Sequence, residues 1–421
     1  MLQVNIIRQN PELIKERLAV KHFKQLDLVD EVLQWDDKRK QFQLEQEGLL
    51  AKINAASKEI GQLMAKGDKE GAELRKKEVA DLKSRQSQEK LTEAEKKIES
   101  ILYQLPNLPS SKVPKGKTPE DNVVVREGGK KPELSADAMP HWDLAKKFNL
   151  IDFELGNKIT GSGFPVYINK GAKLQRSLIS YFLDFNTSGG YTEYMPPHMV
   201  NEASAFGTGQ LPDKEGQMYF VNEDNLYLIP TAEVPVTNVY RDVIVKEADL
   251  PIKMTAYTPC FRREAGSYGK DVRGLNRVHQ FDKVEIVQLV KPEVSYEAHE
   301  EMILHVEKLL QSLNLPYRIL ALCGGDMSFA SALTYDFEVW SAAQQKWLEV
   351  SSVSNFEAYQ TNRLKARYKD ANGKNQLLHS LNGSSLALPR IVAALLENNQ
   401  AGASIKLPNV LHTYFGGSHI S

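Results

Sequence analysis

Cysteine and net charge are both nearly absent from this chain, and each absence excludes a class of protein. Only Cys260 and Cys323 are cysteine, too few for a disulfide framework or a cysteine-rich zinc site. We expect both thiols to be small, partly buried residues of a protein in a reducing compartment. The formal net charge of −1 gives no global basic field, so any contact with RNA must come from local patches.

Long hydrophobic runs and a signal sequence are also lacking. No apolar run approaches the length needed to span a bilayer. The N-terminal residues Met-Leu-Gln-Val-Asn lack the charged and apolar regions of a signal peptide. We therefore predict a soluble, cytoplasmic protein with no membrane contact. A length of 421 residues indicates two or three domains.

Proline is missing from residues 27 to 105, where Glu, Lys, Gln and Ala are frequent. Steps of three and four residues connect a heptad seam, which is the pattern of a coiled coil. The seam consists of Val32, Trp35, Arg39, Phe42, Gln46, Leu49, Ile53, Ala56, Ile60 and Leu63. The residues Ala65-Lys66-Gly67-Asp68 interrupt it, which favours a helix end and a reversal of the chain. A second seam, with a shift between Leu82 and Leu91, consists of Val79, Leu82, Leu91, Ala94, Ile98, Ile101 and Leu105.

These two seams predict an antiparallel two-helix coiled coil over residues 27–105. Each helix of roughly 38 residues would be about 57 Å long, so the hairpin must project into solvent. Its basic residues are interleaved with carboxylates, which is typical of a solvated helix face, but they could also contact phosphates. They are Lys38, Arg39, Lys40, Arg75, Lys76, Lys77, Lys83, Arg85, Lys90, Lys96 and Lys97.

A proline-rich segment, residues 106–120, follows the hairpin. Its four prolines prevent helix continuation and stiffen the chain, so we predict a linker between an N-terminal domain, residues 1–105, and a second domain, residues 121–421. In the second domain we expect strands at 123–125, 226–229, 252–257, 284–290 and 347–351. Helices are expected at 175–186, 389–398 and 295–313, the last with Leu304, Leu309 and Leu310 facing inward. Several strands without regular intervening helices favour an α+β fold with an antiparallel sheet.

The residues with the clearest chemistry form two arms around a glycine-rich stretch. Phe261-Arg262-Arg263-Glu264 precedes it, and Arg277-Val-His-Gln-Phe-Asp-Lys-Val-Glu285 follows it. An isolated F-R-x-E would be a weak signal, but two strands joined by a loop with Gly266, Gly269 and Gly274 are a stronger one. Arg262 offers a planar fork for a phosphate. Phe281 offers a flat face for a purine, a contact worth roughly 1–3 kcal/mol.

Further motifs make the chain resemble the seryl-tRNA synthetases over its whole length. Gly190-Tyr-Thr-Glu-Tyr-Met-Pro-Pro197 resembles class II motif 1, residues 261–285 resemble motif 2, and Leu381-Asn-Gly-Ser-Ser-Leu-Ala-Leu-Pro-Arg390 resembles motif 3. Thr231-Ala232-Glu233 is similar to the serine-recognition triplet of the family. The resemblance implies a class II synthetase antiparallel sheet flanked by helices, a homodimer built by motif 1, and an ATP-dependent serine–tRNA ligase.

The resemblance also implies roles in the reaction. Arg262 would hold the α-phosphate and the serine carboxylate, Glu264 would accept from the adenine amino group, and Arg390 would cover the adenine opposite Phe281. Serine's carboxylate is already a nucleophile at neutral pH, so adenylate formation needs orientation and charge neutralisation rather than a general base. The implied catalytic residues are Arg262, Glu264 and Arg390. The implied ATP-binding residues are Arg262, Arg263, Glu264, Arg277, Val278, Phe281, Glu349, Val350, Ser351, Ser352 and Arg390.

Serine and magnesium are assigned in the same way. Thr231 and Glu233 would face the ammonium of serine, Glu285 and Ser384 its hydroxyl, and Ala232 and Arg262 would complete the site. Glu349 and Ser352 would bind Mg²⁺, a hard cation that prefers oxygen ligands. Taken singly, each of these carboxylates is explained more simply by an ion pair. The implied partners are ATP, L-serine and tRNA(Ser), the last bound by the hairpin, and a role with tRNA(Sec) stays open.

Some residues depart from the family pattern. Ser385, Ala387 and Pro389 stand where glycines are frequent, and Val353 where many members have cysteine. A proline is acceptable in the first turn of the helix that follows. We expect His279 to be a hydrogen-bonded structural residue, because the reaction has no step that requires an imidazole.

Two alternatives remain beside the synthetase. A related ligase that loads an amino acid onto a carrier protein would be expected to lack the long hairpin. A non-catalytic coiled-coil adaptor would have been favoured by loss of Arg262, Glu285, Glu349 or Arg390, and all four are present.

Overall fold

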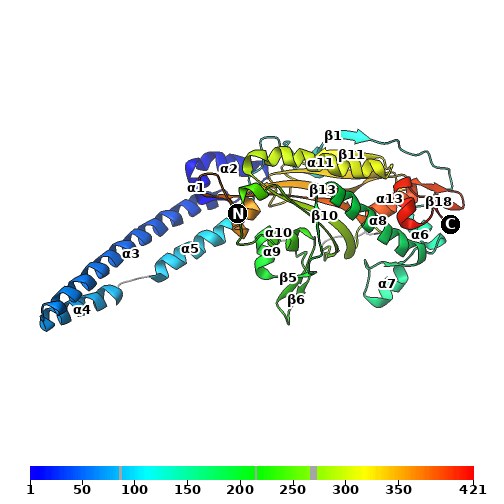
Figure 1. Ribbon diagram of the computed structural model, residues 1–421. Coiled ribbons are helices and arrows are strands. Elements are labelled where there is room, and N and C mark those ends of the chain that lie inside the picture. Colours follow the sequence, from blue (N-terminus) through cyan, green and yellow to red (C-terminus); the bar gives the residue numbers. More distant parts are fainter. Residues whose placement is uncertain (85–87, 214–215, 266–272) are drawn as a thin grey trace. The chain divides into compact units, whose positions relative to one another are not determined.

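The computed structural model describes residues 1–84, 88–213, 216–265 and 273–421 (Figure 1). The chain forms two compact units. One unit comprises Leu2–Ala19 and Phe23–Pro106, and the other comprises Met1, Val20–His22 and Asn107–Ser421. Each unit is described separately below.

The first unit contains the predicted helical hairpin. Helix α3, Asp27–Ala65, is followed by α4, Lys69–Ser84, and α5, Gln88–Leu102. The reversal lies where the glycine predicts it, since Gly67 has a φ of 79°, a conformation that disfavours side chains with a Cβ. Helices α1, Val4–Gln9, and α2, Pro11–Val20, precede the hairpin and were not predicted.

The burial pattern of the hairpin confirms both predicted seams. Between residues 37 and 65, the side chains that are not exposed are the eight seam residues Arg39, Phe42, Gln46, Leu49, Ile53, Ala56, Ile60 and Leu63. In the returning half of the hairpin, the side chains of all seven predicted seam residues are likewise buried or half-buried. The shift expected between Leu82 and Leu91 spans residues outside the described part of the chain.

The second unit is built on an eight-stranded sheet in the order β1-β11-β12-β13-β16-β10-β9-β4 (Figure 1). Neighbouring strands are antiparallel except β4 and β9. The bounds are β1 Val123–Gly128, β11 Tyr317–Ala321, β12 Leu333–Ser341, β13 Lys346–Glu357, β16 His379–Ala387, β10 Gln280–Val290, β9 Ile252–Phe261 and β4 Thr192–Tyr194. This confirms the predicted α+β class, and the predicted strands within 123–125, 252–257, 284–290 and 347–351 are present.

Three helices share one hydrophobic core with the sheet: α8 Asn169–Ser188, α11 Ser295–Ser312 and α13 Leu388–Asn398. All three were predicted, as was β7, Leu226–Leu228. The orientation expected for Leu304 is wrong, since its side chain is 41% exposed. The buried face of α11 contains Met302, Ile303, Val306, Leu309 and Leu310, and a turn of 3.6 residues places Leu304 beyond its edge.

Shorter elements complete the second unit. The helices are α6 His141–Lys147, α7 Phe153–Ile159, α9 Glu202–Thr208, α10 Glu233–Asn238, α12 Tyr359–Leu364 and α14 His412–Phe415. The strands are β2 Ile151–Asp152, β3 Val166–Tyr167, β5 Met199–Asn201, β6 Phe220–Val221, β8 Ile244–Lys246, β14 Arg367–Lys369, β15 Asn375–Leu377, β17 Gln400–Ala401, β18 Ser404–Lys406 and β19 His419–Ile420. Among the described residues, every helix is too short or too polar to cross a membrane.

The two faces of strand β10 pack against different hydrophobic cores, and this determines to which side its polar side chains point. Val284 and Ile286 belong to the main core under α8, α11 and α13. Val287 and Leu289 belong to a second core with residues of α10. Because side chains alternate along a strand, Lys283 and Glu285 must point to the α10 face.

Candidate active site

The α10 face of β10 holds a buried polar cluster. The Thr231 hydroxyl donates to Glu285 Oε2 at 2.8 Å, and the ammonium of Lys283 lies 2.6 Å from the same oxygen. Ser384 on β16 pairs directly with Glu285 in the sheet register, so their side chains share a face. The structure thus brings together three of the residues predicted to recognise serine, from the loop before α10, β10 and β16.

Glu233, at the first position of α10, adds a second carboxylate to this cluster. Its backbone N–H donates to Thr231 Oγ1 at 3.2 Å, and Gln360 Nε2 donates to its Oε1 at 2.6 Å. Burial, and then repulsion from the carboxylate of Glu285, raise the pKa of Glu233 to about 7. The remaining residue of the triplet, Ala232, is fully buried and contributes packing.

Two members of the cluster, Lys283 and Gln360, were not predicted from the sequence. Lys283 could have been found, because it lies two residues before Glu285 and so shares its strand face. Gln360 could not, since it belongs to α12, a helix without a recognisable motif. Both residues are buried and hold the carboxylates by direct contact.

The arms of motif 2 lie at the ends of β9 and β10, next to this cluster. The Arg262 N–H donates to the His279 carbonyl at 2.9 Å, which extends the β9–β10 pairing beyond the strand ends. The Arg262 guanidinium lies 5.3 Å from the centre of the Phe281 ring, within cation–π range. Arg277 pairs with Glu264 at 2.8 Å. Four predicted residues therefore line one region at the end of β9 and β10.

His279 supports this region through hydrogen bonds and packing. Its N–H donates to the Gly163 carbonyl at 2.8 Å, and its ring stacks on Phe164 at 5.3 Å. Its Nδ1 is 3.1 Å from the hydroxyl of Tyr219. These contacts agree with the structural role expected for His279.

Arg390 enters the site from the start of α13. Its Nε donates to the Asn276 carbonyl at 3.0 Å and its Nη1 to the Glu349 carbonyl at 2.8 Å. Pro389 occupies the first turn of α13, as predicted. The helix begins here because the proline ring fixes φ and has no N–H that the turn would leave unpaired.

A bulge in β13 places Glu349 and Ser352 on one side. In a regular strand, residues three apart face opposite ways. The register with β12 shifts at this point, so that Val350 and Ser351 are both buried while Glu349 stays 52% exposed at its side chain. The predicted metal residues are thus brought together. Val350 and Ser351 point their side chains into the protein, and Ser351 donates to the Ser384 carbonyl at 2.6 Å.

Asp336 is a further carboxylate beside this pair, which was not singled out in the sequence. It lies opposite Ser352 on β12 and accepts its hydroxyl hydrogen bond. Burial, and then the charge of Glu349, raise its pKa well above the ordinary range. Its Oδ1 is buried and has no hydrogen-bond partner among the described residues.

Other predicted residues are placed as follows. Val278 is buried, so only its backbone can face a ligand. The Arg263 side chain is exposed, and its N–H donates to the Gln217 carbonyl at 2.9 Å. Gly266 and Gly269 lie outside the described residues, whereas Gly274 has a φ of 64°.

Two family models match the chain. "Seryl-tRNA synthetase N-terminal domain" matches residues 1–109, and "tRNA synthetase class II core domain (G, H, P, S and T)" matches residues 219–399. The serine–tRNA ligase of Salinibacter ruber is 49% identical, over 100% of this chain and 99% of its own. That of Akkermansia muciniphila is 47% identical, over 100% and 99%.

This chain belongs to the seryl-tRNA synthetases. The solved structure of the Pyrococcus horikoshii seryl-tRNA synthetase complexed with ATP matches it with a TM-score of 0.90 and 34% identity, over 100% of this chain and 99% of that chain. The predicted family, fold and enzyme class are confirmed: an ATP-dependent ligase of serine and tRNA. The alternative of a carrier-protein ligase without the hairpin does not fit the match over residues 1–109.

Proposed function

We propose that the buried polar cluster binds L-serine and that the motif 2 arms and Arg390 bind ATP, so that the enzyme forms seryl-adenylate and transfers serine to the 3′ end of tRNA(Ser). The observation that carries this proposal is the pair of buried carboxylates, Glu285 on β10 and Glu233 at the start of α10, which are close enough for the charge of Glu285 to raise the pKa of Glu233. Glu233 would pair with the ammonium of serine, and Glu285 with Ser384 would accept and donate to its hydroxyl.

Charge neutralisation is the task of the ATP-binding residues. Arg262 would bind the α-phosphate and the serine carboxylate, which repel each other as they approach. Phe281 and Arg390 would enclose the adenine, with Glu264 accepting from its amino group. Arg277, paired with Glu264, would assist the distal phosphates.

A divalent cation fits the oxygen donors on β12 and β13. Mg²⁺ usually takes one or two carboxylates and completes its shell with substrate phosphates and water, and the described residues hold no cluster of three or more His, Cys, Asp or Glu for a metal. Glu349 and Ser352 would hold the ion, and Asp336, whose Oδ1 has no hydrogen-bond partner among the described residues, lies beside them. When bound, Mg²⁺ would neutralise charge on the phosphates.

The experiment that tests the function is ATP–pyrophosphate exchange with each of the twenty amino acids. We expect serine to stimulate exchange and the other amino acids to leave it near background. Efficient exchange with a different amino acid would contradict the assignment of the cluster. Charging of purified tRNA(Ser) and tRNA(Sec) tests the transfer step. We expect both to be substrates if recognition depends on the long variable arm of the tRNA, which the hairpin would contact.

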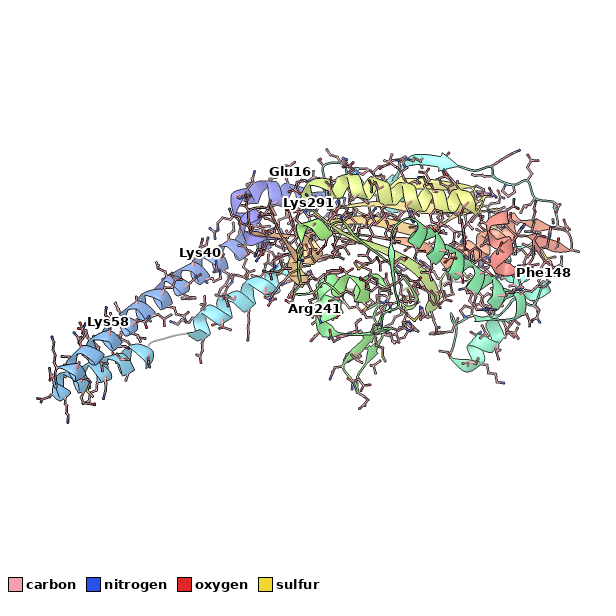
Figure 2. The ribbon with its side chains drawn as sticks, viewed as in Figure 1. Glu16, Lys40, Lys58, Phe148, Arg241 and Lys291 are labelled. Carbon is pink, nitrogen blue, oxygen red and sulfur yellow. The ribbon has the colours of Figure 1, made fainter. Side chains whose placement is uncertain are left out.

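The helical hairpin supplies the tRNA contact in this proposal. Its exposed lysines line the outside of α3, as Figure 2 shows for Lys40 and Lys58. Part of the basic charge is neutralised within the hairpin: Lys40 lies 3.0 Å from Asp36 and Lys76 lies 2.6 Å from Glu73. The lysines without such an ion pair are the better candidates for phosphates, since a pair must break before its cation can meet RNA.

The protein should act as a cytoplasmic homodimer. Strand β4, in the segment that resembles motif 1, is an edge of the sheet, and edges invite pairing with a second chain. Met195, just beyond β4, is 88% exposed. Sedimentation at micromolar concentration should give twice the mass of the chain, and a fully active monomer would contradict the proposal.

A further inference from the structure

A buried hydrogen-bond network connects α6 and α13 to residues 274–276, which lie within motif 2. Glu397, near the end of α13, accepts from the His141 backbone N–H at 3.0 Å and lies 2.8 Å from its Nδ1. Both side chains are fully buried. The Leu275 N–H donates to His141 Nε2 at 2.9 Å, so this nitrogen is an acceptor and the ring proton lies on Nδ1, toward Glu397. One histidine thus joins a carboxylate to a backbone amide.

The carboxylate end of this network is itself fixed. Glu397 accepts from the Ser341 hydroxyl at the end of β12 and, at 3.0 Å, from Gln344 Nε2 in the turn that follows. Burial opposes ionisation of Glu397, but the hydrogen bonds from His141 and Ser341 outweigh it and lower its pKa. The histidine therefore rests against an ionised, immobile acceptor.

The backbone beside Leu275 is fitted to the His141 ring. Gly274 has a φ of +64°, and a Cβ at this position would lie 2.3 Å from His141 Nε2. Such an approach is possible only for glycine. The neighbouring Arg273 guanidinium lies 4.5 Å from the centre of the Trp142 ring. Two consecutive residues at the start of α6 thus form a surface on which residues 273–275 lie.

The same backbone leads directly to an ATP residue. The Asn276 carbonyl, next to Leu275, accepts from Arg390 Nε at 3.0 Å. Arg390 and Glu397 are seven residues apart on α13, close to two turns, so they lie on one side of that helix. Residues 274–276 are therefore attached to α13 twice, once through Arg390 and once through His141.

We propose that His141 and Glu397 are positioning residues of the ATP site. They hold residues 274–276 so that the Asn276 carbonyl orients the Arg390 guanidinium toward the nucleotide. Within the described part of the chain, none of the hydrogen bonds of His141 reaches the proposed serine-binding cluster. Loss of the His141 side chain should therefore weaken ATP binding and leave serine binding unchanged. The proposal rests on the role assigned to Arg390 above.

The test compares two substitutions at one position. His141→Leu fills the space but offers the Leu275 N–H no acceptor. His141→Gln can supply both an acceptor for Leu275 and a donor for Glu397. In the exchange assay with the full-length enzyme, we expect His141→Leu to raise the KM for ATP about tenfold, with the KM for serine changed less than about twofold, and His141→Gln to recover most of the loss. His379→Leu is the matched control, because His379 pairs with Val290 at the far end of β10 and β16.

A second variant reaches the same contact from the other side. Gly274→Ala should push the backbone from the His141 ring and raise the KM for ATP selectively, even if His141→Leu does not fold. Equal increases in both KM values, no change in a folded variant, or no recovery by His141→Gln would overturn the positioning role. Arg390→Ala tests the ATP-binding role of Arg390 itself, on which this proposal rests. If Arg390→Ala leaves the KM for ATP unchanged, that role is wrong, whatever the result for His141.

Discussion

Replacing Glu233 by glutamine should make the protein more stable and much less active. Glu233 is buried, and burial together with the Glu285 charge raises its pKa from 4.5 to about 7. Each pKa unit corresponds to about 1.36 kcal/mol, so keeping this carboxylate ionised in the folded protein opposes folding by about 3 kcal/mol. Glutamine has nearly the same shape, cannot ionise, and still offers Gln360 an oxygen.

The sign and the pH range of this effect follow from the raised pKa. The folded protein binds the Glu233 proton more tightly than the unfolded chain, so the contribution of Glu233 to stability is most favourable below pH 4.5 and falls as the pH rises to about 7. Glu233→Gln avoids this fall. Its gain should be near zero at the acid end and reach about 3 kcal/mol above pH 7.

Thermal unfolding of the ligand-free protein at pH 5, 6, 7 and 8 measures this gain. At about 2 °C per kcal/mol for a domain of this size, the midpoint should rise by about 6 °C at pH 8. Glu223→Gln, an exposed carboxylate, serves as the control. The reasoning is refuted if the gain does not grow with pH, or if Glu233→Gln is the less stable protein at pH 8.

Activity should change in the opposite direction. The ammonium of serine loses its charged partner, and a hydrogen bond to a charged group contributes about 1.5–3 kcal/mol. We expect kcat/KM for serine in the exchange assay to fall about 10- to 100-fold, while the KM for ATP stays within about twofold. A variant that is more stable and equally active would remove Glu233 from the serine site.

Three further predictions test other parts of the site. Arg262→Ala should reduce the exchange rate at least about 100-fold, as expected for one preorganised donor, and a loss below about tenfold would contradict its role. Alanine should be rejected by about 10⁴-fold without editing, because it has no hydroxyl to bond Glu285 and Ser384, and efficient alanyl-adenylate formation would show that the pocket is misassigned. Removal of residues 27–105 should leave exchange within about tenfold but abolish serylation, and the intact enzyme's affinity for tRNA should fall with salt, whereas an unchanged charging rate would make the hairpin a spacer.

Periodicity explains what could be predicted from the sequence. The heptad seam of α3 is a local property, because a helix that buries one face repeats a seam residue on that face in every turn. Motifs 2 and 3 are also local, because the strand ends and helix start that hold Arg262 and Arg390 lie within them. Residue type and spacing were sufficient for the seam, whereas the roles of Arg262 and Arg390 come from the family resemblance and stay predictions.

The rest depends on contacts between distant segments or on local irregularity. The bulge at Val350 lets Glu349 and Ser352 face the same way, although a spacing of three in a regular strand predicts opposite faces. Gln360 reaches Glu233 from a helix 127 residues away in the chain. His141 reads as a lone histidine in the sequence, because its partners Glu397 and Leu275 are 256 and 134 residues distant.

The charges of the buried polar cluster also bear on our proposal that it binds serine. Among the described residues of the cluster, two carboxylates, Glu233 and Glu285, face one cation, Lys283. Lys283 lies on Glu285, and burial, followed by the charge of Glu285, raises the pKa of Glu233. In the proposed complex, the α-ammonium of serine would be the cation beside Glu233 and Thr231, and its hydroxyl would meet Glu285 and Ser384. Binding would then replace a destabilising repulsion by an ion pair, so the empty site would lower the stability of the free enzyme and serine would restore it.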